Sequence, residues 1–276
     1  MTAPTTPPIR IAITGVTGRM GSTLLRLARA DEGMLVAGAT ERHGAACIGL
    51  DAGLAARLGA LEVSVMDDLG KAVEKGRVQV VIDFTGPRAS IEHARICAER
   101  KVALVVGSTG FSSLEKEKLA EASQQIPLVA APNMSVGVNL VIRMAGELAK
   151  VLGASFDVDI LEAHHRLKKD APSGTALRLA EEIAKATGRG ASSFRFERHG
   201  QVGERPPNEI GLQTLRGGDV VGEHTVYFFG EGERVELTHR ATSRDPFASG
   251  ALRAARWVVT QPPGLYDMQN VLGFSR

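Results

Sequence analysis

The stretch from Ile9 to Gly21 reads IRIAITGVTGRMG and decides the fold of the N-terminal half. Its alternating isoleucines predict a short buried strand, and the apolar residues that follow the turn recur with helical spacing. Three glycines, Gly15, Gly18 and Gly21, separate the two elements and permit a tight turn with close packing of helix on strand. A helix that begins there offers N–H groups and a partial positive charge to a pyrophosphate. The stretch therefore predicts a dinucleotide site.

An acidic residue after the next strand supports this interpretation. Met34 to Ala39 reads as a second apolar strand, and Glu41 follows the last glycine of the turn at the roughly 20-residue spacing of a ribose-binding carboxylate. Arg42 beside it could meet a 2′-phosphate, so the pair predicts tolerance of both NADH and NADPH. The turn departs from the usual G-x-G-x-x-G, because Thr17 precedes the second glycine. A glycine-rich turn that binds no ligand remains the alternative.

The N-terminal half continues as strands that alternate with helices. Apolar runs at 78–84, 102–106 and 128–131 read as buried strands, and Ser112 with Glu115 predicts a capping box for a later helix. Residues 45–73 are weakly patterned and are assigned to loop and helix. This alternation predicts a parallel sheet with right-handed crossovers. The loops after the last two strands, 107–110 and 131–134, end where such sheets bind ligands, although ordinary turns would have similar sequences.

The pattern changes after Pro132. We expect helices at 138–152, 173–188 and 247–259, with strands at 156–163, 209–215, 225–229 and 235–239. Consecutive strands joined by turns favour an antiparallel or mixed sheet. The predicted fold class is therefore α/β. It has a Rossmann-type dinucleotide domain over 1–132 and an α+β domain over 133–245. A C-terminal segment, 246–276, follows them.

Composition excludes several classes of protein. The 276 residues suggest about two domains, and 43% hydrophobic with 23% charged residues is typical of a globular protein. A net charge of +2 and 4% aromatic residues argue against a nucleic-acid partner. No apolar run approaches the ~18 residues of a membrane span, and Met1 to Arg10 lacks the apolar core of a signal peptide. With two widely separated cysteines, we expect a cytoplasmic protein.

A second constellation, EAHHRLKKDAPSGTA, runs from Glu162 to Ala176 and joins a strand to a helix. Its cations and the small residues at the helix start suit a carboxylate or phosphate, and histidine and lysine can exchange or donate protons. Taken singly, one histidine could be a buried structural side chain, and the lysines could be solvated. No third ligand stands at metal-binding spacing, so a metal site is not expected. The whole string favours an anion site with acid–base groups.

These motifs together resemble the dihydrodipicolinate reductase family. The resemblance rests on GVTGRMG, Glu41 with Arg42, GSTG at 107–110 and the string at 162–176, and VGEHT at 221–225 extends it over nearly the whole chain. It implies reduction of a cyclic imine dicarboxylate to tetrahydrodipicolinate on the route to diaminopimelate and lysine. NADPH or NADH would deliver a hydride to ring carbon C4. It also implies that the domain over 133–245 binds the substrate and forms a homotetramer through its sheets. The segment 246–276 would pack back on the dinucleotide domain.

The resemblance assigns roles to individual residues. His164 matches the proton donor and acceptor, and Lys168 matches a second proton donor. His165, Gly174 and Thr175 match substrate contacts. The positions that match cofactor contacts are Gly15, Val16, Thr17, Gly18, Arg19, Met20, Glu41, Arg42, Gly107, Ser108, Thr109, Ala131, Pro132, Asn133 and Met134. Met134 stands where many members have phenylalanine, and Ser108 stands where others have threonine.

Two other functions are compatible with part of the pattern. A two-domain dehydrogenase of the aspartate-semialdehyde type needs a cysteine nucleophile. Cys97 falls in the middle of a predicted helix, however, and Cys47 has no helix start or basic neighbour. A non-enzymatic NADPH-sensing regulator would keep the glycine turn but would not need the histidine and lysine loop.

Overall fold

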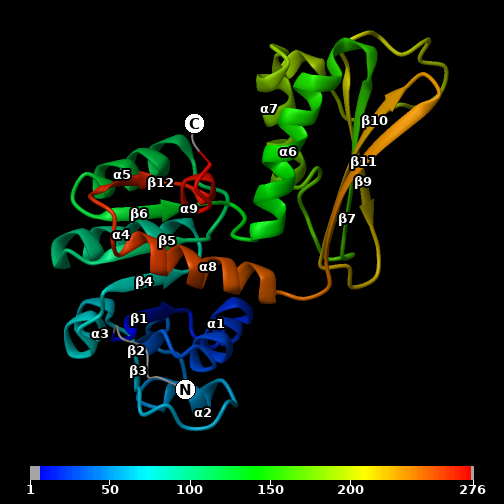
Figure 1. The fold of residues 1–276 in the computed structure, drawn as a ribbon. Coiled ribbons are helices and arrows are strands. Elements are labelled where there is room, and N and C mark those ends of the chain that lie inside the picture. The colour runs from blue at the N-terminus through cyan, green and yellow to red at the C-terminus, as the bar shows by residue number, and fades with distance from the viewer. Residues whose placement is uncertain (1–6, 275–276) are drawn as a thin grey trace, which may run out of the picture. The chain divides into compact units, whose positions relative to one another are not determined.

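A computed structural model describes residues 7–274 and separates them into two compact units (Figure 1). The first unit comprises the chain up to Val136 together with the segment that begins at Asp245. The second unit comprises Gly137–Arg244. Within the described residues, no helix combines the length and apolar character that crossing a membrane requires.

The first unit is built on a parallel sheet with the strand order β12-β6-β5-β4-β1-β2-β3, and every recorded pairing in it is parallel. Its strands are β1 (Ile9–Thr14), β2 (Met34–Thr40), β3 (Val65–Met66), β4 (Val80–Asp83), β5 (Ala103–Val106), β6 (Pro127–Ala130) and β12 (Gly264–Tyr266). The Rossmann-type parallel sheet predicted from the glycine turn and the alternating elements is therefore confirmed.

Helices cover both faces of this sheet. They are α1 (Arg19–Arg29), α2 (Ala52–Ala55), α3 (Leu69–Gly76), α4 (Pro87–Arg100), α5 (Ser113–Ser123), α8 (Asp245–Val258) and α9 (Met268–Val271). Helices α1 and α8 pack in one core with Ile11 and Ile13, whereas α3, α4 and α5 pack in another with Ala12. Alternate residues of β1 thus enter opposite cores, as a strand buried on both faces requires. Ser112 caps α5 through the predicted capping box.

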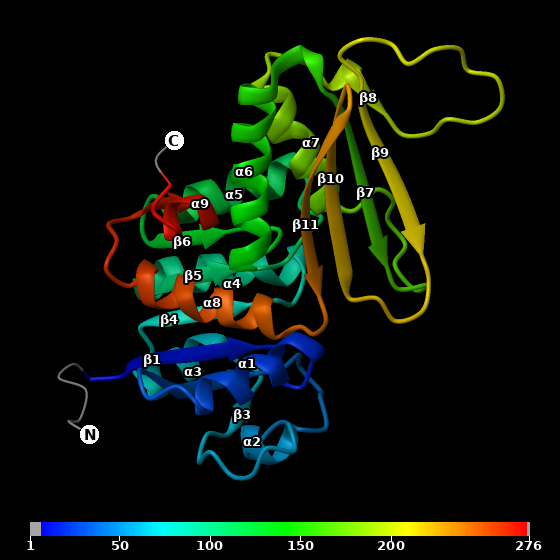
Figure 2. The same ribbon diagram turned by 45° about the vertical axis from the view of Figure 1, so that its right-hand side comes forward.

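The second unit has a mixed sheet with the order β11-β10-β7-β9-β8, in which β7 pairs parallel to β9 and antiparallel to β10 (Figure 2). Its strands are β7 (Asp157–His164), β8 (Phe194–Arg195), β9 (Ile210–Arg216), β10 (Gly222–Gly230) and β11 (Glu233–Ala241). The sheet packs on α6 (Val136–Leu152) and α7 (Gly174–Ala186). Two short 3₁₀ helices are η1 (Gly153–Ser155) and η2 (Ala191–Ser193).

One face of the second sheet is buried by these helices. Val158, Ile160, Leu212, Val226 and Phe228 point into the core that α6 and α7 share. All five are even-numbered, and side chains alternate along a strand. Residues at even positions nearer the carboxyl end of β7 therefore also face the helices, and Glu162 is one of them.

Candidate active site

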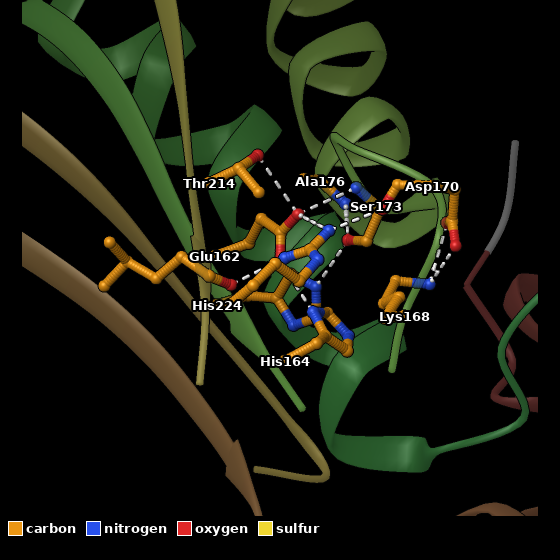
Figure 3. A network of polar contacts seen from close by, with 10 residues as sticks. Glu162, His164, Lys168, Asp170, Ser173, Ala176, Thr214 and His224 are labelled. Atoms are coloured by element: carbon orange, nitrogen blue, oxygen red, sulfur yellow. Dashed lines mark hydrogen bonds and ion pairs between the residues drawn. The ribbon is translucent and has the colours of Figure 1, made fainter. Parts of the chain in front are cut away.

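A buried carboxylate organises the second unit at the end of β7. Glu162 lies on the helix-facing side of the sheet, and its side chain is 0% exposed. Its Oε2 accepts hydrogen bonds from His164 Nδ1 (2.6 Å) and Arg216 Nη1 (2.8 Å). Its Oε1 accepts from Arg216 Nη2 (2.9 Å), the Ser173 amide (3.0 Å) and Thr214 Oγ1 (3.2 Å). Figure 3 shows His164, Ser173 and Thr214 grouped around Glu162.

The charge of Glu162 is fixed by these contacts. Burial opposes ionisation and would raise its pKa, but the hydrogen bonds from His164 and Arg216 outweigh burial and hold the pKa at about 2. An ionised carboxylate only accepts hydrogen bonds, so His164 must donate its Nδ1 proton to Glu162. Nε2 of His164 is then the ring atom that can exchange a proton with a substrate.

The absence of a side chain at Gly222 leaves room for the His164 ring. A Cβ at this glycine would lie 3.1 Å from Nε2 of His164. Gly222 begins β10, and its place beside His164 accounts for the glycine of the VGEHT motif. A larger residue there would press on the nitrogen that faces away from Glu162.

The histidine of the same motif supports the start of α7. His224 Nε2 lies 3.0 Å from Ser173 Oγ, and Ser173 caps α7 by accepting from the Ala176 amide at 3.2 Å. Burial lowers the pKa of His224 to about 3, and the nearby charge of His164 acts in the same direction. His224 is therefore neutral at physiological pH. Its ring meets that of His164 edge to face, with 5.2 Å between centroids.

The first turn of α7 offers an anion site. Ser173 is the N-cap, so the amides of Gly174 and Thr175 belong to the turn in which a helix has no intrahelical acceptors for its N–H groups. Gly174 is exposed, and a Cβ there would meet no atom within 4 Å. The space above this turn is open to a ligand.

The lysine of the loop lies close to this helix start (Figure 3). Lys168 Nζ contacts both carboxylate oxygens of Asp170, at 2.8 Å and 2.7 Å. The Asp170 carbonyl in turn accepts from Arg216 Nη2 at 2.5 Å. His165 follows the end of β7, and its buried Nδ1 finds no hydrogen-bond partner among the described residues. The structure therefore brings the loop, the helix start and the sheet residues into one polar cluster.

The glycine turn of the first unit has the shape of a phosphate cradle. Gly15 adopts a φ of +60°, which disfavours other residues. A Cβ at Gly21 would lie 2.1 Å from the Gly15 carbonyl oxygen, so a side chain at this position would collide with the strand end. Val16 is buried, whereas Thr17, Gly18 and Arg19 are exposed, and Met20 is half-buried. Helix α1 begins at Arg19 and presents its N-terminus at this turn.

The predicted ribose-binding residue is tied to the same turn. Glu41 Oε1 accepts from the Thr17 amide (3.1 Å) and from Thr17 Oγ1 (2.7 Å), and Oε2 accepts from the Arg42 amide (3.1 Å). Partial burial would raise the pKa of Glu41, but the Thr17 hydrogen bonds outweigh it and lower the pKa. The residue that departs from the usual glycine pattern therefore holds the carboxylate beside the cradle. The Arg42 side chain is exposed next to it.

The later loops lie at the carboxyl ends of neighbouring strands. Gly107 follows β5, and a Cβ there would lie 2.1 Å from the Phe84 ring, so a side chain at this position would displace that ring. Ser108 Oγ bonds Ser90 Oγ on α4 at 2.8 Å, and Thr109 is exposed. After β6, Ala131 is buried and Pro132 is exposed.

The end of the second loop is fixed by internal contacts. The side-chain oxygen of Asn133 accepts from the Ser135 amide at 2.9 Å. Met134 is 1% exposed and belongs to the core that α8 covers. The Met134 side chain is therefore packed in the core and is not presented at this edge of the sheet.

Sequence reasoning left several residues of these clusters without a role. Glu162 stood in the quoted string, yet only its burial and its five hydrogen-bond donors show it to be the centre of the cluster. Arg216, Thr214 and His224 come from other strands, and nothing in their spacing along the chain links them to Glu162.

Asp83, at the end of β4 in the first unit, was also not singled out in the sequence. Its buried carboxylate accepts hydrogen bonds from Thr14 Oγ1 at 3.0 Å and from Thr85 Oγ1 at 2.6 Å. The hydrogen bond from Thr14 therefore links β1, the strand before the glycine turn, to the neighbouring strand β4.

Neither cysteine suits a nucleophile, and no metal centre is evident. Cys97 is completely buried in α4, and burial raises the pKa of its thiol. Cys47 is half-buried and packs against the core of the first unit. Among residues 7–274, no group of three or more histidine, cysteine, aspartate or glutamate side chains is placed to hold a metal ion.

The comparisons with known proteins agree across the whole chain. Residues 9–134 match the family model described as dihydrodipicolinate reductase, N-terminus, and residues 137–272 match the model for its C-terminus. A protein named 4-hydroxy-tetrahydrodipicolinate reductase from Myxococcus xanthus is 65% identical over 268 residues, covering 97% of this chain and 99% of the relative. One of the same name from Anaeromyxobacter dehalogenans is 57% identical, covering 96% and 97%.

A solved structure extends the likeness to three dimensions. A dipicolinate-bound dihydrodipicolinate reductase from a Paenisporosarcina species matches with a TM-score of 0.73 and 26% identity, covering 95% of this chain and 99% of that one. The NAD complex of GenD2, from gentamicin A biosynthesis, shares the fold with a TM-score of 0.61 at 16% identity. The resemblance noted in the sequence motifs is confirmed, and the chain belongs to the dihydrodipicolinate reductase family.

Proposed function

We propose that this protein is a 4-hydroxy-tetrahydrodipicolinate reductase. It reduces the cyclic imine dicarboxylate at ring carbon C4 to tetrahydrodipicolinate, on the route to diaminopimelate and lysine, using NADH or NADPH. The observation that carries the proposal is the His164 ring, held by the ionised Glu162 at 2.6 Å beside the start of α7. A proton-exchanging group next to an anion-binding helix start suits a dicarboxylate that takes up a hydride and a proton.

The second unit supplies charge balance for the substrate. The amides of Gly174 and Thr175 would donate hydrogen bonds to a carboxylate at the N-terminus of α7, where the helix dipole favours negative charge. Lys168 adds a cation, and its present partner is the exposed carboxylate of Asp170. A substrate carboxylate can replace Asp170 as that partner without burying an unpaired charge. His165, with its unpartnered Nδ1, is a further donor for the ligand.

His164 and Lys168 are the proposed proton donors. Addition of a hydride leaves negative charge on the ring, and a positioned acid must neutralise it. His164 can donate from Nε2 because Nδ1 is committed to Glu162. The lysine ammonium holds a carboxylate and is the second donor. His224 stays neutral, so it adds no competing charge beside His164.

The first unit fits a dinucleotide. The cradle of Gly15, Gly18 and Gly21 leaves no room for side chains near the backbone, as binding of a pyrophosphate at a helix start requires. Glu41 would take the ribose hydroxyls, Arg42 would meet a 2′-phosphate, and the loops 107–109 and 131–134 would border the nicotinamide. When bound, this cofactor supplies the hydride.

A coupled assay tests the proposed reaction. Purified protein should oxidise NADH or NADPH only when dihydrodipicolinate synthase and its two substrates are present, because the reducible imine forms only then. A non-enzymatic sensor would bind NADPH without oxidising it, and a semialdehyde dehydrogenase would turn over an aldehyde instead. Dipicolinate, the ligand named for the related structure, should compete with the synthase product.

We also propose a cytoplasmic homotetramer built through the second sheet, as the family resemblance implies. The sheet face opposite α6 and α7 carries apolar side chains, among them Leu215 at 53% and Phe229 at 38% exposure. Phe229 stacks on Tyr227, with 5.6 Å between ring centroids. Sedimentation equilibrium of the purified protein tests the stoichiometry, and a monomeric species would contradict it.

A further inference from the structure

Glu162 is held by Arg216 through two parallel hydrogen bonds. The guanidinium nitrogens lie 2.8 Å and 2.9 Å from the two carboxylate oxygens, and the Arg216 side chain is only 19% exposed. Arg216 ends β9 and stands opposite His164 in the parallel pairing with β7. Paired contacts of this kind fix the plane and direction of a carboxylate as well as its charge.

Each oxygen of Glu162 then holds a different part of the site. Oε2 takes the Nδ1 proton of His164, whereas Oε1 takes the amide of Ser173, the N-cap of α7. The ring that is to donate a proton and the helix start that is to bind a carboxylate therefore share one anchor. A displacement of the carboxylate would move both.

Arg216 extends the same chain of contacts to the lysine. Nη2, the nitrogen that bonds Glu162 Oε1, also donates to the carbonyl of Asp170. The side chain of Asp170 holds Lys168 Nζ at 2.7 Å. Both proposed proton donors are thus connected to one buried ion pair, in contacts that Figure 3 displays together.

We propose that Glu162 and Arg216 are positioning residues that fix the tautomer of His164, the start of α7 and the loop of Lys168 in one reactive arrangement. This inference rests on the proposed reductase function. A buried ion pair is weak as a source of stability, because desolvation offsets most of its attraction. Its many directed contacts with functional groups give it a geometric role instead.

The charges that face His164 set the expected pH behaviour. They come from four elements of the second unit: Glu162 on β7, Arg216 on β9, His224 on β10, and Lys168 with Asp170 in the loop. Glu162 is the anion in direct contact with the ring. His224 is neutral because burial lowers its pKa to about 3. Removing the Glu162 charge should therefore change the electrostatic environment of the His164 ring more than removing any other of these groups.

The test is Glu162→Gln in the full-length enzyme. An amide keeps the volume of the side chain but cannot accept from both His164 and Arg216. We expect kcat to fall by about 10²-fold. The pH profile of kcat/KM should also change, because the His164 ring loses the anion that it contacts. Dipicolinate should bind more weakly, because a single amide oxygen cannot accept from both the Ser173 amide and the His164 ring. Wild-type kcat with an unchanged pH profile in the folded variant would overturn the proposal.

A spectroscopic measurement separates this proposal from the proposed function. Nitrogen chemical shifts of the His164 ring report which nitrogen carries the proton, whether or not the protein turns over substrate. Wild type should show the proton on Nδ1, and Glu162→Gln should show a mixture or the other tautomer. Identical tautomers would refute positioning, whereas an inactive wild type with the expected tautomers would refute only the reductase assignment.

Two further variants guard against a purely structural effect. Glu162→Gln with Arg216→Gln removes both charges, so neither partner is left as an unpaired buried charge. If this double variant folds and keeps wild-type kcat, the proposal fails. Asp159→Asn is the matched control, because Asp159 lies on the same strand and is also paired with two arginines, Arg198 and Arg205. Its kcat, KM and pH profile should match wild type.

Discussion

Gly222→Ala should separate the activity of the enzyme from its stability. The backbone of Gly222 is regular β-strand, so alanine is conformationally allowed there. A glycine replaced at such a site usually stabilises a protein by about 0.4–1 kcal/mol, because the unfolded chain loses freedom. The added methyl, however, would lie 3.1 Å from His164 Nε2, closer than ordinary contact by a few tenths of an ångström. The ring must move by about that amount.

The size of this displacement sets the expected loss. A misplacement of 1 Å costs roughly 10²-fold in rate, so a few tenths of an ångström should lower kcat about three- to tenfold. The melting temperature should stay at or slightly above that of wild type, because the His164 ring moves and the backbone does not. Cofactor affinity should be unchanged, since the first unit is untouched.

The assay is steady-state reduction in the coupled system, with a melting curve and an NADPH titration on the same preparation. Gly217→Ala is the control, because Gly217 lies in the turn between β9 and β10 and a Cβ there would meet no atom within 4 Å. It should keep wild-type kcat. The reasoning would be refuted if Gly222→Ala kept full activity, or lost activity only in proportion to a drop in melting temperature.

Two other predictions follow from the same contacts. Arg42→Ala should raise KM for NADPH about tenfold while affecting NADH less. Thr17→Val should raise KM mainly for NADH, because it removes the hydrogen bond from Thr17 Oγ1 to Glu41 and leaves only that from the Thr17 amide. Equal changes for both cofactors would contradict either statement. Because the pKa of Glu162 is lowered from 4.5 to about 2 on folding, its carboxylate stabilises the protein fully above pH 4.5, and this contribution is lost as pH falls toward 2. The melting temperature of Glu162→Gln should therefore fall less steeply than that of wild type across this window, and parallel curves would be evidence against the assignment.

The sequence predicted those helices and strands whose residues show a clear hydrophobic pattern along the chain. Strand β1 and helix α1 were predicted because alternating isoleucines, three glycines and a helical stripe follow one another without interruption. The short strands β3, β8 and β12 were missed. Two or three residues are too few to show a hydrophobic periodicity, and such strands form only by pairing with a neighbouring strand. The stretch 45–73 is assigned only to loop and helix for the same reason, and it holds α2, β3 and the start of α3.

The site was predictable only as far as it is continuous in the chain. His164, Lys168 and the start of α7 stand in one string, so their types and spacing indicated an anion site with proton donors. Arg216 and His224 join them through the pairing of β7 with β9 and β10, and such register cannot be derived from composition or spacing. Thr17 was noted as a departure from the glycine pattern, but its bond to Glu41 is visible only in three dimensions.

The most direct test of the proposed mechanism is kcat of His164→Gln in the coupled assay, measured on protein whose melting curve and NADPH affinity match wild type. If His164 delivers the proton that follows hydride addition, kcat should fall by about 10²–10⁴-fold. KM should change little, because the proton matters only once the hydride has moved. A variant that keeps near-wild-type kcat, or that loses activity only in step with unfolding, would contradict the proposed role of His164.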